Sequence, residues 1–580
     1  MVRKIVILAV ILLTTGLALA GPPRLYVAED LRTYIAASTA LDGLVVMKCC
    51  GEDLARFASY ANLTPVRVNL SYVLSASNAD AVMFVDEGVL DRVPGALAYA
   101  KLHGILAVPV RDRMEVRRIV RTHGFTRVLL IGLNASGERA DPGALLNAYN
   151  REVGGKGAVL CFRDDPLCPL AALYAAAKGA RLVVLNSTGV LPHLPGTPLT
   201  LVLSFETLRS LGPEALAVAF EGGVMVSPLG IITGPDTAST TLIMARSLYF
   251  LRRPPRCHVN ALVAYVEGAS VAASKIVDSL RRAGLRVVEL TPLGSNLTRY
   301  TLPRYLPRSG IIYLNLHGNP WAMGTRPEGS PLIAYSDVPP LREGSVVVTL
   351  SCSTLDFSRL ASGSESLALR MLVRGAVAYI GSRRIEYEDL FGSSNYPELL
   401  VDLILDGYTV GEAVSVVNSL HAVRRGSGGR SWRAAYTLLL GDPDLRFCGR
   451  RARAYDVRVS GDSVTVKLAE DRSTLLLRVP AGGYSYARAA SGDLRVESFV
   501  KREGDRDYMY IYITGALGHE LYKGRVIEIR LVSRGPGVWL VAAALAAVLV
   551  VLLAVMAIYR GVSWPRRPGR RLSCTRRSSC

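Results

Sequence analysis

Several motifs that would assign a chemistry are missing from these 580 residues. Neither G-x-G-x-x-G nor G-x-x-x-x-G-K-[ST] occurs, so the chain has no glycine-rich loop of the kind that cradles phosphates, and a nucleotide or flavodoxin-like redox protein has no support. No two cysteines have C-x-x-C spacing, which removes the basis for a thioredoxin-like motif or a zinc ribbon. No zinc knuckle or recognition-helix pattern occurs, so nucleic acid is not an expected partner.

Acidic residues are fewer than basic residues, and the formal net charge at pH 7 is +20. Part of the positive excess lies in the last segment of the chain, where no acidic residue follows position 559. The seven arginines of this segment are Arg560, Arg566, Arg567, Arg570, Arg571, Arg576 and Arg577. A basic cluster beside an apolar run is typical of the cytoplasmic flank of a membrane helix, where it meets anionic lipid headgroups.

The apolar run before this cluster, from Val538 to Tyr559, contains no charged residue. At about 1.5 Å per residue, a helix of this length crosses a bilayer core of about 30 Å. Trp539 and Tyr559 stand at its two ends, and such amphipathic rings favour the membrane interface. We therefore expect one transmembrane helix at 538–559 and a basic cytoplasmic tail at 560–580.

The first twenty residues have the parts of a secretory signal. Arg3 and Lys4 precede a short apolar run, and Ala18-Leu19-Ala20 offers a small-residue cleavage step. We expect a signal peptide at 1–20, and the alternative is an uncleaved N-terminal anchor. Together with the C-terminal helix, this predicts a single-pass protein of the cell membrane with an extracellular ectodomain.

Short apolar runs alternate with amphipathic ones from about residue 24 to 450. Strand, helix, strand repetition predicts a mostly parallel sheet covered by helices on both faces. We divide this part into an N-terminal α/β region at 21–180, either a first subdomain or a propeptide-like domain, and an α/β domain at 181–450. The predicted strands are 81–85, 105–110, 128–133, 158–162, 182–185, 262–266, 285–290, 310–316, 345–350 and 376–380.

The pattern changes after about residue 451. Segments of near-alternating polarity are separated by turns rich in Gly, Asp and Ser, which predicts a small antiparallel β domain, a sandwich, at 451–534. This domain would stand between the α/β body and the membrane. Its predicted strands are 456–459, 463–468, 475–479, 508–513 and 526–531.

The chain has nine cysteines. Cys161 and Cys168 flank a short polar loop, and we expect a local disulfide between them in an exported protein. The sequence leaves the pairing of four further cysteines open, namely Cys49, Cys50, Cys257 and Cys448.

Two predicted strands end in reactive residues. His317 and Gly318 follow the strand at 310–316, and Cys352 follows the strand that begins at Ser345. If these strands are parallel neighbours, both ends reach the same edge of the sheet, where open α/β sheets bind ligands. An imidazole beside a thiol is the minimal machinery of a cysteine hydrolase. The N–H groups of Gly318 and Cys352 are candidate donors to the oxyanion.

Each of these residues also has an ordinary structural interpretation. A cysteine at a strand end is usually a buried small hydrophobe. A His-Gly step is usually a turn, as we take His103-Gly104 and His123-Gly124 to be.

The order of six segments resembles the gingipain family of cysteine peptidases, in the caspase-like clan. The similarity extends over roughly 180–447. The resemblance implies two α/β subdomains followed by an immunoglobulin-like domain, with His317 as general base and Cys352 as nucleophile. The similar segments are 226–236, 261–290, 313–318, 347–352, 375–382 and 436–445.

Two departures from the family pattern affect the site. Leu316 stands where the family often has a glycine, and no glycine follows Cys352 within several residues. They motivate a second hypothesis, a catalytically inactive surface binding or structural protein on the same fold. The block Gly441-Asp442-Pro443 resembles the family's closing block, and we interpret it as a structural turn.

Substrate specificity stays open. Glu386, Glu388 and Asp389 would suit a pocket for a basic side chain, whereas Arg383 and Arg384 would favour an acidic one. We interpret this segment as a solvated loop of mixed charge.

The sequence thus predicts a cell-surface cysteine endopeptidase acting on extracellular or envelope polypeptides through a Cys-His dyad. No cofactor is expected, and a structural calcium ion cannot be read from the sequence.

Overall fold

The computed structural model of the 580-residue chain describes residues 24–155, 157–186, 194–211, 220–221, 224–255, 260–327, 329–383, 396–424, 437–447, 455–515, 520–533, 547–553 and 555–556. The predicted signal peptide at 1–20 and the predicted tail at 560–580 lie outside these residues.

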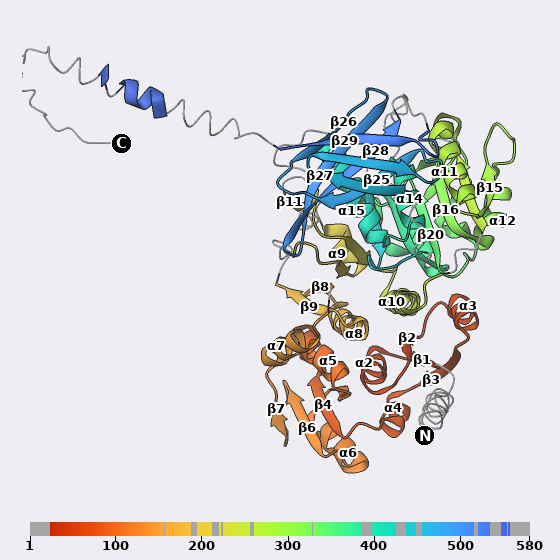
Figure 1. Ribbon diagram of the computed structural model, residues 1–580. Coiled ribbons are helices and arrows are strands. Elements are labelled where there is room, and N and C mark those ends of the chain that lie inside the picture. Colours follow the sequence, from red (N-terminus) through yellow and green to blue (C-terminus); the bar gives the residue numbers. More distant parts are fainter. Residues whose placement is uncertain are drawn as a thin grey trace, which may run out of the picture.

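A ten-stranded sheet with the order β15-β14-β16-β20-β21-β22-β13-β10-β8-β9 runs through the body of the molecule (Figure 1). Neighbouring strands are parallel except β21 and β22, which confirms the predicted mostly parallel sheet. Because β8 and β9 belong to it, the sheet extends across position 180, where we had divided the chain. Its strands are β8 (Ala158–Phe162), β9 (Arg181–Leu185), β10 (Leu199–Val202), β13 (Leu229–Ile232), β14 (Asn260–Tyr265), β15 (Arg286–Leu290), β16 (Ser309–Asn315), β20 (Ser345–Thr349), β21 (Ala376–Ser382) and β22 (Thr437–Gly441).

Helices cover both faces of this sheet, because its central strands are apolar on both sides. Ile311 and Tyr313 of β16 enter one core, whereas Ile312 and Leu314 enter the other, as the two-residue period of a strand requires. The first core includes α11 (Ser270–Arg282), α14 (Tyr396–Leu405) and α15 (Val410–Arg424). The second includes α8 (Cys168–Lys178), α10 (Thr237–Arg252) and α13 (Leu367–Val373). Shorter elements are α9 (Phe205–Ser210), β11 (Phe220–Glu221), β12 (Val224–Met225) and α12 (Thr301–Tyr305).

Two smaller parallel sheets precede the large one and lie at the opposite end of the molecule from the C-terminal β domain (Figure 1). The first has the order β2-β1-β3 and the second β5-β4-β6-β7. Helices α2 and α5 pack against α8 and so join this part to the large sheet. The elements are β1 (Arg24–Ala28), α2 (Leu31–Ala40), β2 (Leu44–Met47), α3 (Gly51–Ala61), β3 (Thr64–Val68), α4 (Leu70–Ala76), β4 (Ala81–Asp86), α5 (Pro94–Leu102), β5 (Leu106–Val110), α6 (Arg113–His123), β6 (Arg127–Ile131), β7 (Glu138–Arg139) and α7 (Pro142–Glu152).

A fully buried arginine connects the first small sheet to the body. The guanidinium of Arg246 on α10 donates from Nε and Nη2 to the two carboxylate oxygens of Glu343, at 2.8 and 2.9 Å. It also donates to the backbone carbonyls of Val373 and Asp53, at 2.7 and 3.3 Å. A bidentate pair with further hydrogen bonds is the arrangement in which a charged side chain tolerates burial.

The Gly-Asp-Pro block has the structural role that we expected. Asp442 is fully buried after β22, and its carboxylate accepts hydrogen bonds from Lys178 Nζ at 2.7 Å and from the Tyr174 hydroxyl at 2.6 Å. Lys178 also pairs with Asp444 at 2.8 Å. Burial alone would lower the pKa of Lys178, but the two carboxylates raise it, so the ammonium stays charged and holds α8 against the end of β22.

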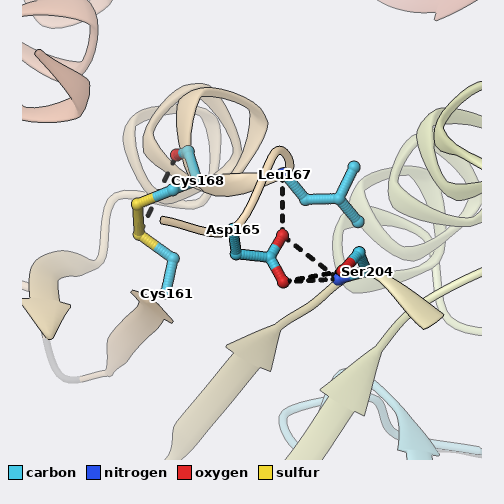
Figure 2. The surroundings of a disulfide bond; sticks show 5 residues. All are labelled: Cys161, Asp165, Leu167, Cys168 and Ser204. Carbon is cyan, nitrogen blue, oxygen red and sulfur yellow. Dashed lines mark hydrogen bonds between the residues drawn. A yellow bond between two sulfur atoms is a disulfide. The ribbon is translucent and has the colours of Figure 1, made fainter. Parts of the chain in front are cut away.

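The predicted disulfide between Cys161 and Cys168 is present (Figure 2). The Asp165 carboxylate fixes the loop between the two cysteines, because it accepts hydrogen bonds from the N–H groups of Leu167 and Ser204, at 2.8 and 2.9 Å (Figure 2). The loop at the end of β8 is thereby held against the residue that follows β10.

Two antiparallel sheets form the C-terminal β domain, as predicted. Their orders are β23-β24-β29-β26 and β25-β28-β27, and a separate apolar core lies between them. The second sheet packs on α14 and α15. The strands are β23 (Tyr455–Ser460), β24 (Ser463–Leu468), β25 (Thr474–Pro480), β26 (Tyr486–Ala489), β27 (Leu494–Glu503), β28 (Arg506–Gly515) and β29 (Val526–Val532).

The expected transmembrane segment at 538–559 is described only at 547–553 and 555–556, which are helical. Among the residues with described structure, we find no helix with the length and apolar character needed to cross a bilayer.

A buried carboxyl lies where the β domain packs on α14. Glu398 is fully buried, and neither of its carboxyl oxygens has a hydrogen-bond partner. Burial, followed by the nearby Asp402 carboxyl, raises the pKa of Glu398 to about 8. Asp402, whose pKa is also raised by burial, accepts a 2.7 Å hydrogen bond from the Thr474 hydroxyl of β25. Glu398 therefore keeps its proton at neutral pH.

We expect this proton to make the fold more stable in acid than in weak alkali. The unfolded chain releases the Glu398 proton near its ordinary pKa of 4.5, whereas the folded chain keeps it to about 8. The stabilisation is therefore complete below about pH 4.5 and is lost as pH rises towards 8, by an amount on the order of a few kcal/mol. Urea unfolding of the full chain at pH 5, 7 and 9 measures this loss.

Glu398→Gln should flatten this pH dependence, because the amide has no proton to lose. The matched control is Glu520→Gln, which removes a partly exposed carboxylate paired with Arg282 at 3.4 Å. If the free energy of unfolding changes with pH equally in the parent and in Glu398→Gln, ionisation of Glu398 does not destabilise the fold.

Candidate active site

Strands β16 and β20 are parallel neighbours in the interior of the large sheet. Leu314 pairs with Thr349, and the next N–H, that of Leu350, donates to the Leu314 carbonyl at 3.1 Å. Both strands therefore end at the same edge of the sheet. This is the arrangement in which the residues after two strands meet.

The His-Gly step after β16 begins a small antiparallel sheet. β17 (His317–Gly318) pairs with β18 (Ala322–Gly324), which pairs with β19 (Ile333–Ala334). The side-chain oxygen of Asn319 accepts hydrogen bonds from the N–H groups of Trp321 and Ala322, at 2.9 and 2.8 Å, and closes the turn. The hydrogen bonds that Asn319 accepts, two residues after His317, thus help to fix the position of the His317-Gly318 step.

The segment around Gly318 lies directly on the segment that carries Cys352. A Cβ atom built on Gly318 would be 2.7 Å from the Ser351 Cβ and 3.2 Å from the Cys352 carbonyl oxygen. The N–H of Leu316 donates to the Ser351 hydroxyl at 3.1 Å. The structure thus brings the predicted residues His317, Gly318 and Cys352 to one place, and only a residue without a side chain fits between the two segments.

The backbone turns sharply after Cys352. Ser353 has φ of +52°, a left-handed conformation that is uncommon for residues other than glycine, and it is buried. The turn is held by the N–H of Leu355, which donates to the Ser382 carbonyl of β21 at 2.9 Å. A non-glycine residue in this conformation stores strain of about 1–3 kcal/mol, which is common beside functional groups. Ser353 belongs to the segment after Cys352 in which we noted the absence of a glycine.

The two reactive side chains differ in exposure. His317 is exposed, and Cys352 is partly exposed. Both can therefore be reached from solvent. A structural cysteine of the core would have been fully buried, as Cys161 and Cys168 are.

Ser351 was not among the residues predicted for the site. Its side chain is fully buried, and its hydroxyl accepts the Leu316 N–H and donates towards the Met323 sulfur at 3.6 Å. It joins β16, β18 and the end of β20. Serine next to cysteine carries no recognisable signal in the sequence, so only the structure could identify this role.

Most of the loop considered for specificity lies outside the described residues, including Arg384, Glu386, Glu388 and Asp389. Arg383 is described, and its guanidinium donates to the Leu211 carbonyl at 3.4 Å. In the described part of the chain, no group of three or more His, Cys, Asp or Glu side chains is arranged to hold a metal ion.

The site lies within a segment that matches a known family of peptidases. Residues 254–448 match the model of peptidase family C25, and this segment contains both His317 and Cys352. The match supports a cysteine peptidase of the gingipain type. No curated protein sequence matches the chain significantly.

The solved structures that the chain matches include two of gingipain R. The complex of the RgpB pro- and mature domains of Porphyromonas gingivalis has 12% identity and a TM-score of 0.35, over 78% of this chain and 99% of that chain. The Arg-specific cysteine proteinase gingipain R has 12% identity and a TM-score of 0.35, over 79% of this chain and 98% of that chain. A chain of the separase–securin complex of Saccharomyces cerevisiae has 14% identity and a TM-score of 0.30, over 42% of this chain and 15% of that chain.

Gly318→Ala should destabilise the fold, because the added methyl group meets the Ser351 Cβ and backbone atoms of the next segment. Overpacking of this kind costs about 1–3 kcal/mol. The control is Gly268→Ala, since a Cβ at Gly268 would have no neighbour within 4 Å. Urea unfolding of both variants measures the difference, and equal stability would show that the two segments can move apart freely.

Proposed function

We propose that the chain is a cysteine endopeptidase in which Cys352 is the nucleophile and His317 the general base. The observation that carries the proposal is the contact of the His317-Gly318 step with the Ser351-Cys352 step at the ends of two parallel strands. The family match at 254–448 supports the reaction class. The exposure of both side chains supports access by a polypeptide substrate.

The proposed reaction uses only groups of this chain. The His317 imidazole takes the thiol proton of Cys352, and the thiolate attacks the carbonyl carbon of the scissile peptide bond. The N–H groups of Gly318 and Cys352 stabilise the oxyanion. The imidazolium then gives its proton to the leaving amine, and water hydrolyses the thioester that remains. No cofactor takes part in these steps.

We further propose that the peptidase acts outside the cell, on extracellular or envelope polypeptides, and is held by one helix at 538–559. The described part of this segment supports an anchor, because eight of its apolar side chains, from Val548 to Met556, are 45% to 64% exposed. Such a surface is unfavourable in water. The Cys161–Cys168 disulfide is consistent with an oxidising compartment.

Cys352→Ala should reduce peptide hydrolysis to background, because no other group replaces the thiolate. His317→Ala should reduce it by about 10²–10⁴-fold, the usual contribution of a general base. The control is His123→Ala, which removes the histidine of one of the two His-Gly steps that we take to be plain turns. The measurement is cleavage of a mixed peptide library by the purified protein.

If Cys352→Ala and His317→Ala cleave as fast as the parent, this assignment of the dyad is wrong. If instead the folded parent cleaves nothing and its Cys352 reacts with a peptidyl electrophile no faster than in denaturant, the chain is the inactive binding protein of our second hypothesis.

Deletion of 538–559 should move the protein from the membrane fraction to the soluble fraction. The full chain should resist extraction at alkaline pH, because an apolar helix leaves the bilayer only at high cost. Replacing the tail arginines Arg570 and Arg571 by Gln serves as a control that leaves the apolar run intact. Extraction of the full chain by carbonate alone would contradict the anchor.

A further inference from the structure

Two adjacent cysteines lie outside the candidate active site, in the turn between β2 and α3. Cys49 and Cys50 are both partly exposed. The turn packs on the first residues of α10, where the N–H of Met47 donates to the Thr241 hydroxyl at 2.9 Å. Of the cysteines that the structure describes, Cys49, Cys50 and Cys352 are not part of a disulfide. Cys49 and Cys50 are thus a pair of thiols that the peptidase chemistry does not use.

The two adjacent thiols influence each other. The Cys49 thiol lowers the pKa of Cys50 to about 7, and the Cys50 thiol is the largest cause that raises the pKa of Cys49 well above its usual range. The Cys50 sulfur also lies 3.3 Å from the Ser239 hydroxyl of α10. Cys50 is therefore the better thiolate, and Cys49 holds the proton.

The local backbone supports a negative charge on Cys50. Cys50 is the N-cap residue of α3, and the positive end of a helix dipole favours a thiolate, whereas burial and the carboxylates of Asp236 and Asp53 oppose it. Its φ of +48° is left-handed, which is uncommon for a residue other than glycine. Strain of this kind occurs at sites where the chain holds a reactive group in place.

We propose that Cys49 and Cys50 are a thiol–disulfide exchange site, at which a small-molecule or protein disulfide converts the pair into a vicinal disulfide. The proposal is independent of the peptidase activity. It is motivated by the adjacency of the two partly exposed thiols, the 3.3 Å approach of the Cys50 sulfur to the Ser239 hydroxyl, and the oxidised Cys161–Cys168 pair in the same chain.

The exchange balances as follows. The Cys50 thiolate attacks one sulfur of the donor disulfide, the donor S–S bond breaks, and one donor thiolate leaves. The Cys49 sulfur loses its proton and attacks the Cys50 sulfur, and the second donor thiolate leaves. Two cysteine thiols are oxidised, the donor disulfide is reduced, and the two protons end on the two donor thiols.

A bond between adjacent residues closes a very short loop, so it constrains the unfolded chain little and is not expected to stabilise the fold as Cys161–Cys168 does. Exposed disulfides are the ones that exchange readily. The chemistry of this pair is therefore better suited to exchange with a donor than to cross-linking the fold.

Trypsin provides a direct test, because Lys48 and Arg56 bracket a peptide, 49–56, that contains Cys49, Cys50 and no other cysteine. The full chain is purified without reductant and denatured in an alkylating agent before digestion. The expected peptide carries no alkyl group, is two hydrogen atoms lighter than the dithiol, and takes two alkyl groups only after reduction. The linked peptides of Cys161 and Cys168 are the positive control. A peptide with two alkyl groups before reduction would overturn the proposal.

The order of attack is tested on reduced protein with oxidised glutathione. Cys49→Ser should stop at a glutathione adduct on Cys50, because the resolving thiol is missing. Cys50→Ser should form an adduct on Cys49 more slowly, because burial raises the pKa of the Cys49 thiol even without Cys50. Equal rates for the two variants would refute the assigned roles. Peptide 49–56 of the parent reports on the disulfide even if a variant does not fold.

Discussion

The buried pair of Arg246 and Glu343 is the constraint on which the placement of the site depends. Glu343 lies just before β20, the strand that leads to Cys352, and the Val373 carbonyl lies just before β21. One guanidinium therefore fixes the start of two neighbouring strands. Removal of Glu343 would leave the charge of Arg246 uncompensated in the core, at a cost of about 3–5 kcal/mol. The hydrogen bond to the Asp53 carbonyl extends the same constraint to the first small sheet, which also shares an apolar core with α10.

The central strands could be predicted from the sequence because they are buried on both faces. β16 and β20 read as continuous apolar runs, and their parallel pairing is confirmed. β1 and β3 were missed, because they carry Arg24, Thr64 and Arg67 among apolar residues. β2 was also missed, although its four residues are all apolar. β27 was missed for a similar reason, since Lys501, Arg502 and Glu503 interrupt its alternation. A strand that packs on another domain need not be apolar throughout, and only the tertiary structure shows this.

The same distinction applies to the candidate site. The meeting of the segments after β16 and β20 follows from topology, and topology follows from apolar periodicity, so the sequence could predict it. The left-handed turn at Ser353 and the tight fit at Gly318 depend on atoms contributed by separate elements. The contact of Cys50 with Ser239 joins residues 189 positions apart, and nothing in either local sequence indicates it. Spacing can identify which residues are candidates, but their neighbours decide their reactivity.

The position of β29 has a mechanical consequence. β29 lies inside its sheet, paired on one side with β24 and on the other with β26, and it is the last strand before residue 538. If the segment at 538–559 is fixed in a membrane, a pulling force on the body enters through β29 along its axis. Two ladders of hydrogen bonds must then slide together before the strand can leave, whereas an edge strand would lose only one. The β domain would thus resist the pulling force through shear between the three strands β24, β29 and β26.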